Sequence, residues 1–241
     1  MKYSRYLRPA IVLLVMLAAG VSLVAANEQG GLVDASVLWY EEQEPGTDVY
    51  PVRILVTEGH VRIDDGINDS DFVLLDRRTR FVYSVSHEEQ ATMEMAHHPV
   101  KLDIPDGIHL AAEVQANADA PAIGGKQTQH VKLTANGATC YEAMIVPGLL
   151  DGVAVALAEY ARTLGDRQLN NLQDVPAEIQ TPCFLLRYAY APDRHYLQGL
   201  PVQEWDDAGY RRALVNFSED GKVSRSLFVV PASYPVFQIG G

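Results

Sequence analysis

The sequence predicts a mainly β protein, a curved antiparallel sheet that carries a helical insertion. Between residues 33 and 146, short runs of apolar residues alternate with polar ones and are separated by turn residues. Strands this numerous and evenly spaced are typical of a barrel or a strongly curved sheet. After Pro147 and Gly148 the apolar residues recur at three- and four-residue steps, which indicates a helix.

The first part of the chain reads as a β-meander. In the segment 50–57, Val52, Ile54 and Val56 share one face of a strand and Arg53 and Leu55 share the other. The strands predicted in this way are 37–42, 50–57, 60–64, 72–76, 80–86 and 91–95, and the segments 108–116, 129–135 and 139–146 continue the sheet.

The second part combines a helix with a return to strands. One helical stripe is formed by Leu150, Val153, Leu157, Tyr160, Ala161 and Leu164, which predicts an amphipathic helix over 149–164. The apolar stretch 183–190 fits a helix or a strand. The last strands are expected at 200–205, 210–218 and 223–229, with a hairpin turn at Glu219-Asp220-Gly221.

The N-terminus has the organisation of a secretory signal peptide. Lys2, Arg5 and Arg8 precede an apolar run, and Val24-Ala25-Ala26 places small residues before a cleavage site. The alternative is an uncleaved anchor, but the 16 residues of 11–26 fall short of the roughly 20 needed to span a bilayer. We therefore expect a signal peptide over 1–26, one domain over 27–241, a periplasmic location and no stable membrane anchor.

The charge balance argues against nucleic acid as a partner. The full chain has a net charge of −12, and the predicted leader contains three basic residues and no acidic one. The remaining 16 basic and 31 acidic residues give the mature chain a net charge of −15. Such a chain repels phosphate backbones and anionic lipid surfaces, and its acidity favours solubility.

The two cysteines, Cys140 and Cys183, are predicted to form a disulfide. A lone pair in an oxidising compartment is typically bridged, and the loop of about 44 residues would stabilise the fold by roughly 4 kcal/mol on the chain-entropy model. The alternative is a redox-active or metal-binding pair, for which no Cys-x-x-Cys spacing is present.

No catalytic motif stands out, so we expect a protein that is not an enzyme and that needs no cofactor. The sequence lacks the Gly-x-Ser-x-Gly, His-Glu-x-x-His and glycine-loop patterns. The acidic run from Asp64 to Asp71 lacks the order of a calcium loop and fits a solvated turn. Met93, Met95, His97 and His98 offer thioether and imidazole ligands for copper, but Met is also a common core residue, and we predict no metal site.

Several segments resemble a known family. The quoted segments are Val52-Arg53-Ile54-Leu55-Val56, Val61-Arg62-Ile63-Asp64, Phe72-Val73-Leu74-Leu75-Asp76, Phe81-Val82-Tyr83-Ser84-Val85, Gly199-Leu200-Pro201-Val202 and the closing 226–234. They are similar to periplasmic half-barrel domains related to the lipoprotein carrier LolA, and to uncharacterised exported proteins of that shape. The middle segment, 140–190, departs from LolA itself.

The resemblance implies an unclosed half-barrel whose concave apolar face receives acyl chains or another protein, with the 149–164 helix as a lid. An incompletely closed barrel leaves room for a ligand. The expected lining is Val52, Ile54, Val56, Val61, Ile63, Phe81, Tyr83, Val85, Met93 and Met95. The predicted function is binding of a lipid, another hydrophobic molecule or an apolar segment of an envelope protein. The alternatives are an envelope interaction or sensor module whose core is filled, and a metal-binding protein that uses Met93, Met95, His97 and His98.

Overall fold

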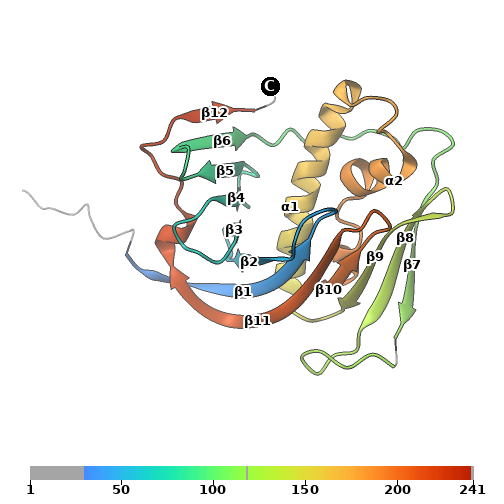
Figure 1. Cartoon of the computed structure of the whole chain (residues 1–241), viewed down its shortest axis with the longest axis horizontal. Helices are drawn as coiled ribbons and strands as arrows, with labels where there is room; N and C mark the ends of the chain where they lie inside the picture. The colour runs from blue at the N-terminus through green and yellow to red at the C-terminus, as the bar shows by residue number, and fades with distance from the viewer. Residues whose placement is uncertain (1–29, 118, 240–241) are drawn as a thin grey trace, which may run out of the picture.

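The computed structural model describes residues 30–117 and 119–239 (Figure 1). The predicted signal peptide, 1–26, lies outside the described residues. Twelve strands form one sheet in the order β12-β6-β5-β4-β3-β2-β1-β11-β10-β9-β8-β7. The two edge strands do not pair with each other, so the sheet is unclosed, and it curves around the long helix α1 (Asp151–Asn170). The predicted fold class is confirmed: a mainly β protein built on a curved, unclosed sheet.

The strands match most of the predicted segments. They are β1 (Leu32–Gln43), β2 (Tyr50–Val56), β3 (His60–Asp64), β4 (Phe72–Asp76), β5 (Val82–Ser86), β6 (Ala91–Met95), β7 (Leu110–Ala116), β8 (Gln129–Ala135), β9 (Ala138–Val146), β10 (Leu200–Trp205), β11 (Arg211–Ser224) and β12 (Val236–Gln238). Shorter helical segments are η1 (Leu172–Asp174), α2 (Pro182–Leu185), the π-helical turn η2 (Leu186–Tyr190), η3 (Tyr196–Gln198) and η4 (Arg225–Phe228). No helix in the described part of the chain is both long and apolar enough to span a bilayer.

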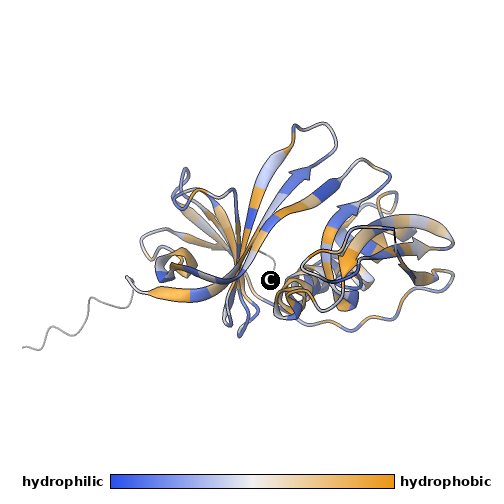
Figure 2. Ribbon diagram, turned by 90° about the horizontal axis from the view of Figure 1, so that it is seen from below, coloured by the Kyte–Doolittle hydropathy of each residue, from blue (hydrophilic) through white to orange (hydrophobic). Residues whose placement is uncertain are grey.

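The sheet consists of two half-sheets joined by the pairing of β1 with β11. Strands β1 to β6 follow one another in chain order on one side, and β7 to β10 follow one another on the other side of β11 (Figure 1). All neighbouring strands are antiparallel except β12, which adds to β6 in parallel. The strands carry both hydrophobic and hydrophilic stretches (Figure 2), and β2 is buried along most of its length, on both of its faces.

The predicted hairpin turn at Glu219-Asp220-Gly221 is wrong, because β11 runs through these residues as one long strand. The register against β1 shifts between the pairs Ala35–Gly221 and Val37–Ser218, so β11 contains an extra residue there and forms a β-bulge. A side chain at Gly221 would lie 2.8 Å from the carbonyl oxygen of Ala35. The turn-like composition thus reflects a close approach of two strands rather than a reversal of the chain.

The helix α1 lies across the concave side of the first half-sheet. Leu150, Val153 and Leu157 share one buried cluster with Leu38 of β1 and Ile54 of β2. Leu157 is only 2% exposed. The concave side of the β1–β6 half is therefore a filled core, closed by the helix whose apolar stripe the sequence predicts.

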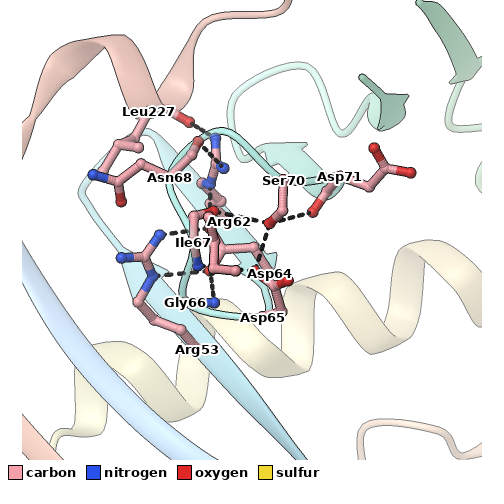
Figure 3. A network of polar contacts seen from close by, with 10 residues as sticks. All are labelled: Arg53, Arg62, Asp64, Asp65, Gly66, Ile67, Asn68, Ser70, Asp71 and Leu227. Atoms are coloured by element: carbon pink, nitrogen blue, oxygen red, sulfur yellow. Dashed lines mark hydrogen bonds and ion pairs between the residues drawn. The ribbon is translucent and has the colours of Figure 1, made fainter. Parts of the chain in front are cut away.

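A buried polar network ties the opposite, convex side of this half to the end of the chain (Figure 3). The Arg62 Nε atom donates to Asp64 Oδ2 at 2.5 Å, and its Nη1 donates to the backbone oxygen of Leu227 at 2.6 Å. Arg53 donates to both Asp64 oxygens at 2.8 Å, and Arg62 also reaches the backbone oxygen of Asn68. Asp64 is thus a buried, paired carboxylate rather than part of a solvated turn, and the network is structural.

Candidate functional site

The structure places only part of the predicted lining beneath α1. Val52, Ile54, Val56, Val61 and Met95 belong to the filled cluster under the helix, and Ile63 packs against that cluster. The same cluster contains Leu150, Val153 and Leu157. The concave face of this half is therefore occupied by the chain itself.

The four other residues predicted to line a ligand site lie elsewhere. Tyr83 and Val85 belong to the convex side, in or against the cluster of Leu55 and Phe228, and the Phe81 ring lies 6.2 Å from the ring of Tyr83. The pairing of Leu75 with Val82 puts Val82, rather than its neighbours, under the helix. A shift of one residue exchanges the two faces of a strand, which explains the error. Met93 is 45% exposed.

The candidate copper ligands do not converge either. His97 Nε2 lies 2.8 Å from Asp166 Oδ2 of α1, which fixes the imidazole against the helix. Met95 is buried beneath α1, whereas Met93 faces solvent. Within residues 30–117 and 119–239, no three His, Cys, Asp or Glu side chains gather as a metal site would require.

The predicted disulfide between Cys140 and Cys183 is present. It joins β9 to α2, so the α2–η2 segment is covalently fixed against the second half-sheet. Thr181 caps α2 by accepting a hydrogen bond from the backbone N–H of Phe184. Together the bridge and the cap position the residues that follow, 186–196.

A pocket of about 290 Å³ lies between the C-terminal half of α1, the segment 187–196 and the second half-sheet. We call it the inner pocket. It is lined by Leu133, Tyr141, Tyr160, Ala161, Leu164, Gly165, Arg187, Tyr188, Ala191, Pro192, His195, Tyr196, Glu204 and Tyr210. Aromatic rings and aliphatic groups make up most of this lining, and a few polar groups converge at one end.

Buried polar groups centred on Glu204 form that end of the inner pocket. The Tyr141 hydroxyl donates to Glu204 Oε1 at 2.7 Å, and Arg212 Nε donates to Oε2 at 2.6 Å. His195 Nε2 lies 3.1 Å from Oε1, close enough for an ion pair when the ring is protonated. Arg212 also donates to the Tyr196 hydroxyl at 3.1 Å. Each oxygen of the buried carboxylate therefore has a donor.

The environment determines the protonation states of these groups. Burial alone raises the pKa of Glu204, but Arg212, followed by His195 and Tyr141, lowers it to about 2. Burial raises the pKa of Tyr196 to about 12, even though Arg212 opposes the shift. Burial, and then the Glu204 charge, raise the pKa of Tyr141 well above its ordinary value. At neutral pH the site thus holds a carboxylate, a guanidinium and neutral phenols.

His195 has unused hydrogen-bonding capacity. It is 7% exposed; its Nε2 lies 3.1 Å from Glu204 Oε1, whereas its Nδ1 has no hydrogen-bond partner among the described residues. The rings of Tyr141 and Tyr196 flank the imidazole, with centroids at 5.2 and 4.0 Å. A buried ring nitrogen without a partner is unfavourable unless another molecule supplies a hydrogen bond.

Arg187 lies at the mouth of the inner pocket. Its guanidinium carbon is 4.7 Å from the ring centroid of Tyr141, 5.1 Å from that of Tyr188 and 5.7 Å from that of Tyr210. Its Nη1 donates to the carboxylate of Asp206. Three aromatic faces and a carboxylate thus hold this cation in place.

A second hollow, the outer pocket, shares Arg187, Tyr188 and Tyr210 with the inner pocket. Its volume is about 650 Å³, and its remaining lining is Glu44, Pro45, Cys183, Phe184, Asp206, Asp207 and Ala208. The two pockets meet at Arg187. Arg187, Tyr188 and Tyr210 line both pockets, and the outer pocket also has the carboxylates Glu44, Asp206 and Asp207 in its lining.

Sequence reasoning missed this site, because its members come from β9, η2, β10 and β11 and converge only through the sheet order. One signal was available. In β10, Glu204 follows Leu200 and Val202 at two-residue steps, so a charged residue is in phase with buried apolar ones. Such a carboxylate must be paired, which points to a buried polar site.

Comparisons with known proteins add little to this geometry. No protein-family model matches the chain, and no curated protein matches it. Among solved structures, the chain is similar to PNGF-II in its C2 and P21 crystal forms, with TM-scores of 0.40 and 0.41 and sequence identities of 8% and 9%. The similarity covers 86% of this chain but only 31% and 32% of the PNGF-II chains. A likeness at this level says nothing about what this chain binds.

Proposed function

We propose that the chain is an exported, non-catalytic binding protein that holds a small, largely apolar ligand in the inner pocket. The main support for this proposal is the inner pocket itself, an aromatic and aliphatic hollow beside α1 with a few polar groups at one end. Binding sites for small molecules typically have this composition. The proposal keeps the hydrophobic ligand that the sequence and its LolA-like segments suggest, and moves the site to the other half of the sheet.

The volume favours a small ligand. At about 290 Å³, the inner pocket is near the lower end of the roughly 300–1,000 Å³ that small-molecule sites occupy. One alkyl chain, one ring system or one apolar side chain of a partner is of suitable size. A lipid with several acyl chains would leave most of its apolar surface in water.

Two features support export. The basic and apolar order of residues 1–26 is typical of a signal peptide. The disulfide between Cys140 and Cys183 belongs to a class of crosslink that persists mainly in oxidising compartments. We therefore place the mature chain in the periplasm, where a carrier of apolar molecules would act.

A ring nitrogen without a partner supports a polar atom on the ligand. His195 lines the inner pocket, and its Nδ1 has no hydrogen-bond partner among the described residues. A ligand that is apolar along most of its length and donates or accepts one hydrogen bond would satisfy the imidazole. This combination of an apolar wall and one polar contact gives orientation as well as affinity.

A matched pair of tryptophan substitutions on α1 tests the proposal. Ala161 lines the inner pocket, whereas Val155 lies on the same helix with 53% of its surface exposed. In calorimetric titrations with 1-octanol, we expect the wild type and Val155→Trp to bind equally and Ala161→Trp to lose binding, because the indole fills the pocket. Absence of binding to the wild type, or equal binding by both variants, would refute the proposed site.

A further inference from the structure

Strand β7 forms one edge of the sheet, and its outer side pairs with no other strand in the described part of the chain (Figure 1). Residues 111–116 are all exposed, and the register between β7 and β8 runs without a bulge. The strand contains no lysine and no proline, which natural proteins commonly place on free edges to prevent strand addition. At the opposite edge, the three-residue strand β12 covers β6. β7 is therefore the long, open edge of this sheet.

The hydrogen bonds at the two ends of β7 show which of its backbone groups are free. The Asn117 N–H donates to the Thr128 oxygen at 3.2 Å, and the Asn136 N–H donates to the His109 oxygen at 2.9 Å. Hydrogen-bonded pairs alternate along antiparallel strands, so the odd-numbered residues direct their backbone groups toward β8. The even-numbered residues direct their N–H and C=O groups outward, and the exposed ones among them are Ala112, Val114 and Ala116.

The apolar face of the second half-sheet also ends at β7. Ala112 pairs with Leu133 of β8 and Val114 pairs with Val131, and both of these β8 side chains are buried. Val114, in contrast, is 42% exposed. A further strand beside β7 would place side chains next to Val114 and continue the apolar face.

The sequence of β7 is complementary to itself in one antiparallel register. In a two-fold pair of identical antiparallel strands, one residue lies on the axis and faces its own copy. With Glu113 on the axis, two carboxylates would face each other, which is unfavourable. With Ala112 on the axis, Glu113 would face an alanine. With Val114 on the axis, Val114 faces its copy, Ala112 faces Ala116, and the Gln115 amide donates to Glu113 of the other copy.

We propose that β7 is a self-association surface, through which two copies of the chain join into one continuous sheet with Val114 on the two-fold axis. In this register the outward backbone groups of Ala112, Val114 and Ala116 pair with those of the second copy. A single strand edge buries less than the roughly 1,600 Å² of a standard interface, so the dimer is weak and reversible. No residue of β7 lines the inner pocket, so the inference is independent of the proposed function.

A cysteine cross-link tests the register. The Cα atoms of a hydrogen-bonded antiparallel pair lie about 5.5 Å apart, within the roughly 4.4–6.8 Å that a disulfide spans. After oxidation at a chain concentration on the order of 100 µM, Val114→Cys should give a covalent dimer in non-reducing electrophoresis. Ala112→Cys, four residues out of register, and Val155→Cys, exposed on α1, should stay monomeric. No cross-link in Val114→Cys, or an equal one in Ala112→Cys, would overturn the inference.

Sedimentation equilibrium tests the backbone pairing. Val114→Pro removes an N–H that points away from β8, so the β7–β8 ladder keeps its hydrogen bonds while the dimer loses one from each copy. We expect the association constant to fall at least about tenfold. Val114→Thr keeps the N–H and the side-chain shape, and should stay within about twofold of the wild type.

Circular dichroism verifies that both variants keep the native fold. Association of the folded proline variant at wild-type strength, or a wild-type chain that stays monomeric at concentrations on the order of 1 mM, would contradict the proposal.

Discussion

The two halves of the sheet use α1 differently. Over β1–β6, the N-terminal part of the helix fills the concave face with Leu150, Val153 and Leu157. Over β8–β10, its C-terminal part stands off, and Tyr160, Ala161 and Leu164 line a pocket. The difference arises from the strands. Val146, Leu200 and Val202 of the second half-sheet also join the buried cluster, but beside the C-terminal part of the helix this half presents the Glu204 carboxylate and the Tyr141 phenol.

We expect the largest loss of stability from breaking the ion pair between Arg212 and Glu204, in the half of the sheet that lines the inner pocket. Arg212→Met leaves Glu204 buried without its guanidinium, so the free energy of unfolding should fall by about 3–5 kcal/mol in urea titrations. Arg211→Met, at the exposed neighbour on the same strand, should change it by less than about 0.5 kcal/mol. A small effect at Arg212 would mean that the polar cluster is not what holds this half together.

The disulfide should stabilise the second half-sheet as well. The double variant Cys140→Ser, Cys183→Ser releases a loop of about 44 residues, and we expect a loss of up to roughly 4 kcal/mol. Because the bridge holds α2 against β9, hydrogen exchange should increase first in 182–196 and leave β2–β5 protected. Uniform loss of protection over both halves would contradict this separation.

Substitution of two leucines of α1 distinguishes residues that stabilise the core from residues that bind the ligand. Leu157 is buried in the filled core, so Leu157→Ala should destabilise the fold by about 2–5 kcal/mol while leaving 1-octanol affinity unchanged. Leu164 is 37% exposed and lines the inner pocket, so Leu164→Ala should cost less than about 1 kcal/mol yet weaken 1-octanol binding. Thermal unfolding measures the stability of both variants, and calorimetry measures their affinity for 1-octanol. A larger loss of affinity in Leu157→Ala than in Leu164→Ala would contradict this division of roles.

The same carboxylate also predicts a pH dependence of the stability. The pKa of Glu204 is lowered from 4.5 to about 2 in the folded chain, so its ionised form stabilises the fold above pH 4.5 and this contribution is lost as the pH falls toward 2. The gap in unfolding free energy between the wild type and Glu204→Gln should therefore narrow over that window. Glu113→Gln, at an exposed carboxylate of β7, should show a constant difference. A constant gap for Glu204→Gln would argue against a paired carboxylate.

The first half-sheet could be predicted from the sequence because alternation with a period of two is a local signal. The helix α1 and the cysteine bridge followed from equally simple signals. The sequence assigned the wrong side chains of β5 to the concave face, because Arg80 adopts a left-handed conformation in the tight turn before the strand. The Arg80 N–H donates to the Asp76 backbone oxygen at 2.8 Å, and local alternation does not reveal this turn. The pocket could not be predicted, since Tyr141 and Arg212 meet Glu204 only through the order of three strands.

The pairing of β1 with β11 has a consequence for biosynthesis. The first described strand, 32–43, pairs with 50–56 on one side and with 211–224 on the other, so the seam with β11 at the centre of the sheet cannot form until residues 211–224 have been made. Contacts of such long sequence separation are slow to form. Closure of the seam is therefore a late step that joins two half-sheets whose own strands are neighbours in the sequence.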